Sequence, residues 1–94
     1  KDGKYRYSTG GRNALDKTSG FESLFASSVE EVDSAENIVV IKTMTGMAQA
    51  VCMSLDNIDF ENIVGTIAGD DTIFVLCRNL KATEEMLNKF RKLI

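Results

Sequence analysis

Residues 62–77 read NIVGTIAGDDTIFVLC, which places two short apolar runs on either side of a Gly-Asp-Asp turn. The runs at 62–68 and 72–77 are rich in Ile, Val, Thr and Phe, residues that favour strands. Gly69 can adopt the backbone conformations that a short turn between the two runs requires. These residues therefore predict a β-hairpin.

A second pair of strands is expected before this hairpin. Residues 29–34 alternate in the manner of a half-exposed strand, and the Ser-Ala-Glu-Asn stretch that begins at Ser34 can turn the chain. The Ile-Val-Val-Ile run at 38–41 is continuous, which is typical of a strand covered on both faces by helices or by another subunit.

Three segments have the apolar spacing of helices, at 19–27, 47–55 and 81–94. Ser19 and Glu22 have the spacing of a capping box at the start of the first. The second is apolar around most of its circumference, so it either needs a partner beyond its own sheet or is wholly buried within the monomer. The predicted order α-β-β-α-β-β-α indicates an α+β fold, a two-layer sandwich with an antiparallel sheet of about four strands and helices on one face. The sheet face opposite the helices must then be covered by something else.

Length and composition predict one compact domain at 19–94, preceded by a polar linker at 1–18. A chain of 94 residues buries only roughly 60–65% of its unfolded surface, so oligomerisation is expected from size alone. The sequence starts at Lys1 rather than Met, which we interpret as the loss of an upstream segment.

The composition predicts a cytoplasmic protein without a membrane segment. Cys52 and Cys77 lie in apolar runs without C-x-x-C spacing, so we expect two reduced core residues. No apolar stretch approaches the ~18–20 residues of a membrane helix. Residues 21–94 carry six basic and twelve acidic side chains, the wrong charge for gripping nucleic-acid phosphates.

Catalysis has little support in the sequence. The chain has no histidine, which excludes Ser-His and Cys-His catalysis, and it has no phosphate-binding glycine motif. The carboxylates of Asp70 and Asp71 stand at the predicted hairpin turn, with Asp56 and Asp59 near the end of the central helix. They admit three interpretations: ordinary turn residues, a site for a guanidinium or ammonium group, or a divalent-metal site.

The Gly-Thr-Ile-Ala-Gly-Asp-Asp-Thr run at 65–72, preceded by Gly-Met-Ala-Gln at 46–49 and Leu-Asp-Asn at 55–57, resembles the C-terminal domain of the bacterial arginine repressor. The resemblance covers roughly residues 20–94. It implies a domain that binds L-arginine as corepressor and assembles into trimers, which pair into a hexamer with arginine at the contact between them. It also implies a preceding winged helix-turn-helix domain that binds operator DNA, of whose wing residues 1–7 would be the end.

The resemblance implies that five residues bind L-arginine. It implies no cofactor, no metal and no catalytic group. Asp70 and Asp71 would hold the ligand, with at least one accepting the guanidinium. Gln49 and Asp56 would meet its α-amino and α-carboxylate end, and Ala68 would line the pocket through its backbone. Two plainer interpretations stay open: Gln49 as a solvated helix residue, and Asp56 as a helix-end charge.

Overall fold

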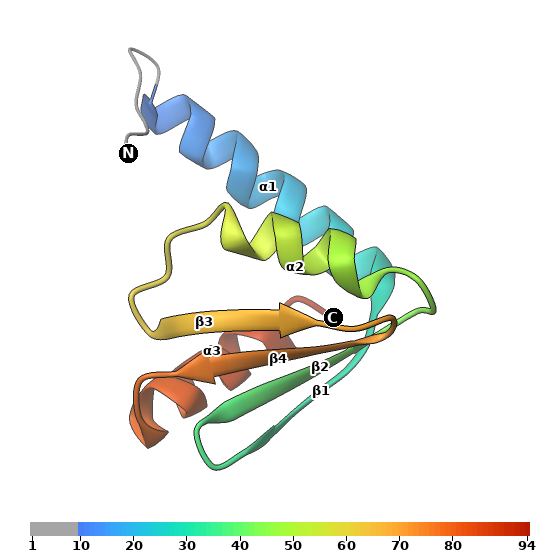
Figure 1. Cartoon of the computed structure of the whole chain (residues 1–94). Coiled ribbons are helices and arrows are strands. Elements are labelled where there is room, and N and C mark those ends of the chain that lie inside the picture. Colours follow the sequence, from blue (N-terminus) through green and yellow to red (C-terminus); the bar gives the residue numbers. More distant parts are fainter. Residues whose placement is uncertain (1–9) are drawn as a thin grey trace.

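A computed structural model describes the backbone of residues 10–94 and the side chains from Ser19 onward. The described part forms a four-stranded sheet with three helices (Figure 1). This confirms the predicted order α-β-β-α-β-β-α and the α+β fold class. The elements are α1 Gly10–Ser28, β1 Val29–Ala35, β2 Ile38–Thr43, α2 Ala48–Asp56, β3 Ile63–Ala68, β4 Thr72–Cys77 and α3 Leu80–Arg91.

The sheet has the strand order β1-β2-β4-β3, and every neighbouring pair is antiparallel. The two predicted hairpins are therefore present, β1 with β2 and β3 with β4. They join through β2 and β4, where Val39 lies opposite Val75 and Ile41 opposite Ile73. This arrangement leaves β3 as an edge strand beside α2.

The core lies between one face of the sheet and the helices. Val39, Ile41, Ile73 and Val75 are fully buried there because alternate residues of a strand point to the same face. From the helix layer, Val51 of α2 is equally buried. The sheet and the helices thus bury one continuous apolar layer.

An aromatic cluster joins α1 to α3 within that layer. Phe25 stacks on Phe90 with ring centroids 5.3 Å apart, and Phe21 meets Phe90 edge-on at 6.4 Å. Phe60, from the loop after α2, approaches the same ring at 6.5 Å. Phe90 therefore connects three segments that are far apart in the sequence.

The predicted bounds of two helices differ from the structure by more than one residue. Helix α1 begins at Gly10 rather than Ser19, so Ser19 does not cap it and the predicted linker is helical from residue 10. Its Gly- and Ser-rich composition favoured a linker, but extending an existing helix adds one hydrogen bond per residue and is easier than starting one. Helix α3 ends at Arg91, before the predicted residue 94. The predicted wing end at 1–7 lies outside the described residues.

Strand β1 departs from the simple alternation that its sequence indicated. Its pairing with β2 shifts between Val29 and Glu31, as at a β-bulge. Val29 and Val32 are three residues apart, yet both are buried, because the extra residue resets the alternation.

The outer face of the sheet is apolar and uncovered in the described part of the chain. Ile67, Phe74 and Leu76 expose 70%, 48% and 41% of their surface. A shallow groove of about 340 Å³ runs over them and over Ile38. None of the helices described is both long and apolar enough to cross a membrane.

Candidate functional site

The polar residues of the predicted site lie along the edge where α2 packs beside β3. Gln49 and Asp56 are seven residues apart on α2, which places them on the same helix face two turns from one another. The Gln49 side-chain amide donates to the Ala68 carbonyl at 2.9 Å. At the other end, the Thr66 hydroxyl donates to Oδ1 of Asp56 at 2.7 Å. Two hydrogen bonds thus tie the helix to its neighbouring strand.

The β3–β4 turn is held against the start of α2 by backbone hydrogen bonds. The Asp70 carbonyl accepts from the amides of Gly46 and Ala48, at 3.1 and 3.2 Å. The first residues of a helix need such acceptors, and the N-cap residue Met47 offers no side-chain hydrogen bond. Gly46 has φ +83°, a conformation that suits glycine and lets the chain turn sharply into α2.

Asp71 is held on the other side of this turn. Its carbonyl accepts from the Thr43 amide at the end of β2, at 2.8 Å. Its carboxylate accepts from the Thr72 hydroxyl at 2.9 Å. The turn is therefore fixed to both β2 and α2, while the carboxylates of Asp70 and Asp71 remain exposed.

The charge of Asp56 is placed where its own helix disfavours it. Asp56 is the last residue of α2, and a helix C-terminus carries partial negative charge. The last turn of α2 contains no basic residue. A cationic group bound beside Asp56 would be favoured by this end of the helix.

The five predicted residues are not all joined in the same way. Side chains connect Gln49 with Ala68, and Asp56 with the strand that Ala68 ends. Asp70 and Asp71 are joined to α2 and β2 through their backbone carbonyls. The structure brings the segments together, and the roles of the five residues in ligand binding stay predictions.

Sequence reasoning missed two neighbours of Asp56. Cys52 is buried, as predicted for a core residue, but its thiol also lies 3.2 Å from the Thr66 hydroxyl oxygen. The Cys52 thiol also lies 3.9 Å from Oδ2 of Asp56. The sequence could have indicated that Cys52 lies beside Asp56, because residues four apart on a helix share a face.

The thiol of Cys52 stays protonated at neutral pH. Burial is the main cause that raises its pKa above the ordinary value of 9.0, and the nearby charge of Asp56 raises it further. Cys52 is therefore a hydrogen-bond donor at this site.

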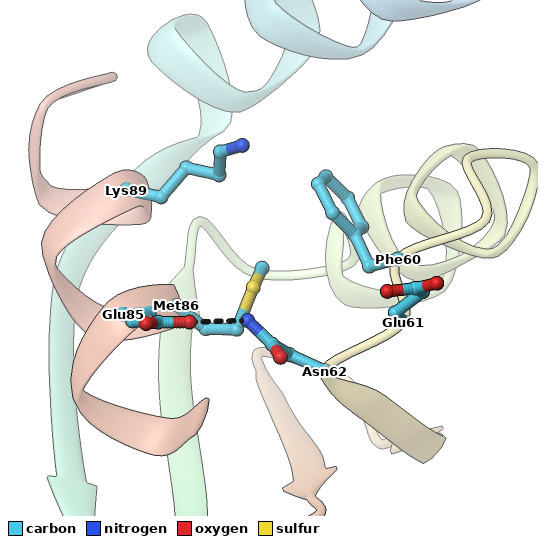
Figure 2. A pocket seen from close by; sticks show the side chains of 6 residues that line it. All are labelled: Phe60, Glu61, Asn62, Glu85, Met86 and Lys89. Carbon is cyan, nitrogen blue, oxygen red and sulfur yellow. Dashed lines mark hydrogen bonds between the residues drawn. The ribbon is translucent and has the colours of Figure 1, made fainter. Parts of the chain in front are cut away.

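A hollow of about 330 Å³ lies between α3 and the loop after α2 (Figure 2). Lys89 and Phe60 face one another across it, with Nζ 5.3 Å from the ring centroid. Asn62 donates to the Glu85 carboxylate at 2.9 Å. These contacts hold the loop that leads from Asp56 to β3 against α3. A smaller hollow, of about 160 Å³, lies beside Asp56 itself.

The described residues include no group of three or more Cys, Asp or Glu side chains that is arranged to hold a metal ion. The acidic edge instead offers separate carboxylates, an amide and backbone carbonyls. Groups of this kind can accept hydrogen bonds from a cationic ligand with several N–H donors.

The fold and this edge together define a class of protein: a small two-layer α+β domain with an acidic polar edge beside an uncovered sheet face. Comparison with known proteins makes the class specific. Residues 25–92 match the family model of the arginine repressor C-terminal domain. The chain belongs to this family, which confirms the resemblance found in the sequence.

Relatives named arginine repressor match the chain along its whole length. That of Thermoanaerobacter sp. (strain X514) is 46% identical, over 100% of this chain and 63% of its own length. That of Alkaliphilus oremlandii (strain OhILAs) is 43% identical, with the same coverage. That of Ruminiclostridium cellulolyticum is 39% identical, over 99% of this chain and 62% of its own. The chain thus spans a little less than two thirds of the length of these relatives.

Proposed function

We propose that this chain is the L-arginine-sensing and assembling core of a transcriptional regulator of arginine genes. The observation that carries the proposal is the acidic edge where α2, β3 and the turn at 69–71 meet. Asp70 and Asp71 would accept the guanidinium of L-arginine. Gln49 and Asp56 would meet its α-amino and α-carboxylate end, with Ala68 lining the site through its backbone.

The chemistry of the edge supports a ligand that is cationic at two points. A guanidinium presents five N–H donors in a plane, and carboxylates accept such donors in pairs. An α-ammonium group would offset the unfavourable position of Asp56 at the helix C-terminus. L-arginine carries both groups and acts here as an effector, with no further cofactor proposed.

Assembly would cover the outer face of the sheet. Exposed apolar patches of this kind are typical of protein interfaces, and Phe74 and Ile67 are among the most exposed apolar residues of this one. The family implies trimers that pair into a hexamer, with L-arginine bound at the contact between them. Binding at such a contact stabilises the assembly, with coupling between sites of about 1–3 kcal/mol.

Contact with operator DNA would come from another part of the whole protein. Residues 21–94 carry twelve acidic and six basic side chains, a charge that repels phosphates. In this proposal a preceding DNA-binding domain reads the operator, and arginine changes how the assembled cores orient those domains.

Calorimetric titration of the chain with L-arginine tests the proposal, with L-citrulline as the matched neutral ligand. Citrulline replaces the guanidinium by a neutral urea, which would leave a carboxylate without its charged partner. We expect saturable binding of arginine near one per chain and far weaker binding of citrulline. Equal heats from the two ligands, or none from either, would contradict the assignment.

The Asp71→Asn substitution locates the guanidinium site. Losing a hydrogen bond to a charged group costs about 1.5–3 kcal/mol, so arginine affinity should fall at least about tenfold without unfolding. Glu84→Gln is the control, because it removes the same charge from an exposed position on α3. Wild-type affinity in Asp71→Asn would remove Asp71 from the site.

A second candidate function is an assembly module without a small-molecule ligand. The apolar outer face favours it, because that face needs a cover whether or not the acidic edge binds anything. Sedimentation with and without arginine separates the two. An assembly state that ignores saturating arginine would favour the module alone.

A further inference from the structure

We propose that Cys52 and Thr66 are positioning residues that aim the carboxylate of Asp56 at the α-ammonium group of the ligand. The two side chains form a hydrogen-bonded chain that ends on Asp56. The inference rests on the proposed arginine site and adds two residues to it.

The direction of each proton in this chain is determined by chemistry. An ionised carboxylate can only accept, so the Thr66 hydroxyl donates its proton to Oδ1 of Asp56, 2.7 Å away. The oxygen of Thr66 is then free to accept, and the Cys52 thiol donates to it at 3.2 Å. The path therefore runs from Cys52 through Thr66 to Asp56.

The path fixes a carboxylate that would otherwise rotate. Asp56 is exposed and is the last residue of its helix, where backbone and side chain are least constrained. Holding Oδ1 from β3 sets the plane of the carboxylate and leaves its other lone pairs for a ligand. A preorganised acceptor binds more tightly because less freedom is lost on binding.

The position of the path separates it from the rest of the site. Gln49 is tied to Ala68 at the other end of the helix face, and the Asp70–Asp71 turn is held by backbone bonds to β2 and α2. Cys52 and Thr66 therefore act on one end of the ligand. Their removal should alter recognition of the α-ammonium group and leave recognition of the guanidinium intact.

A comparison of two ligands tests this. The first is L-arginine, and the second is deaminoarginine, which has a hydrogen atom in place of the α-ammonium group. Calorimetric titration of the wild-type chain should show a preference for L-arginine of about tenfold or more, the size of one charged hydrogen bond. In Thr66→Val, affinity for L-arginine should fall about tenfold and affinity for deaminoarginine less than about twofold.

Two further substitutions test the individual groups of this hydrogen-bonded path. Thr66→Ser keeps the hydroxyl and should restore the preference for L-arginine. Cys52→Ala removes the outer donor while the Thr66–Asp56 bond remains, so affinity for L-arginine should fall only about threefold. The Cys52→Ala substitution should again leave the affinity for deaminoarginine largely unchanged.

Matched controls separate positioning from stability. Thr83→Val removes a threonine hydroxyl that donates to the Asn79 carbonyl on α3, and Cys77→Ala removes the other buried thiol. Both should lower the melting temperature and leave the ratio of the two ligand affinities unchanged.

The outcomes distinguish this inference from the proposed function. A wild-type chain that binds no arginine would overturn the arginine site and the positioning role with it. A wild-type chain that binds arginine, beside a Thr66→Val variant with the wild-type preference for it, would overturn the positioning role alone. Loss of affinity for both ligands to the same degree would also overturn it, because that is the result of a purely structural bond.

Discussion

The two faces of the sheet are built from the same strands and the same kinds of residue, yet within the described residues only one of them is covered. On the inner face, Val39 and Val75 are fully buried beneath the helices. On the outer face, the neighbouring Phe74 exposes about half of its surface. Burial here is decided by what packs against a strand, because the residue types on the two faces are alike. The inner face accounts for folding, and the outer face is available for assembly.

Phe90→Ala should give the largest effect, because it breaks the inner layer where three segments meet. Phe90 is fully buried against Phe21, Phe25 and Phe60. Removing such a ring typically costs about 3–5 kcal/mol, a large part of the stability of a small domain. Urea unfolding followed by circular dichroism measures the change.

The exposed Leu80 on α3 serves as the control for loss of an apolar side chain. Leu80→Ala should change the free energy of unfolding by less than about 0.5 kcal/mol. A comparable loss in both variants would mean that the aromatic cluster is not the centre of the core.

Phe74→Asp should have the next largest effect, on assembly more than on folding. A charge at the centre of the outer face would be desolvated in any interface there, and central aromatic residues often contribute about 2 kcal/mol or more to binding. We expect monomers in sedimentation equilibrium with a nearly unchanged circular dichroism spectrum. Asn88→Asp adds the same charge on the exposed side of α3 and should leave the assembly intact.

An oligomer that survives Phe74→Asp would show that another surface holds the copies together. A variant that unfolds instead would show that the outer face already contributes to the stability of the single chain. Either result would contradict the assignment of folding to the inner face and of assembly to the outer face.

Much of the fold follows from local patterns in the sequence. The run around Gly69 predicted the β3–β4 hairpin, and the continuous apolar strand at 38–41 indicated that both sheet faces need a cover. The start of α1 at Gly10 was missed, because Gly-, Ser- and Thr-rich segments favour linkers unless a helix extends into them. The N-cap of α3 was also missed, although Asn79 accepts from the Ala82 amide as capping residues do.

The candidate site was predictable only in part, for a physical reason. Spacing along α2 could place Gln49, Cys52 and Asp56 on one helix face. It could not reveal that β3 is an edge strand beside that face, because strand order is a long-range property of the sheet. The contact between Cys52 and Thr66 depends on that order, so a residue predicted to be plain core also borders the site.

The smallest effect is expected from the two thiols, Cys52 and Cys77, which both lie in the covered layer. Burial is the main cause that raises the pKa of each above the ordinary value of 9.0. The folded chain therefore keeps its thiol protons at a pH where the unfolded chain has begun to lose them. The resulting stability is fully present below the ordinary pKa and is lost as the pH rises through the folded value.

Urea unfolding between about pH 7 and about pH 10 should show a free energy of unfolding that declines at the alkaline end. Part of this decline should vanish in the double variant Cys52→Ala and Cys77→Ala, and that difference isolates the contribution of the thiols. The same decline in both proteins would mean that the thiols are as accessible to water when folded as when unfolded. The inner face would then be less completely sealed than the packing of Val39 and Val75 implies, and the contrast between the two faces of the sheet would be one of degree.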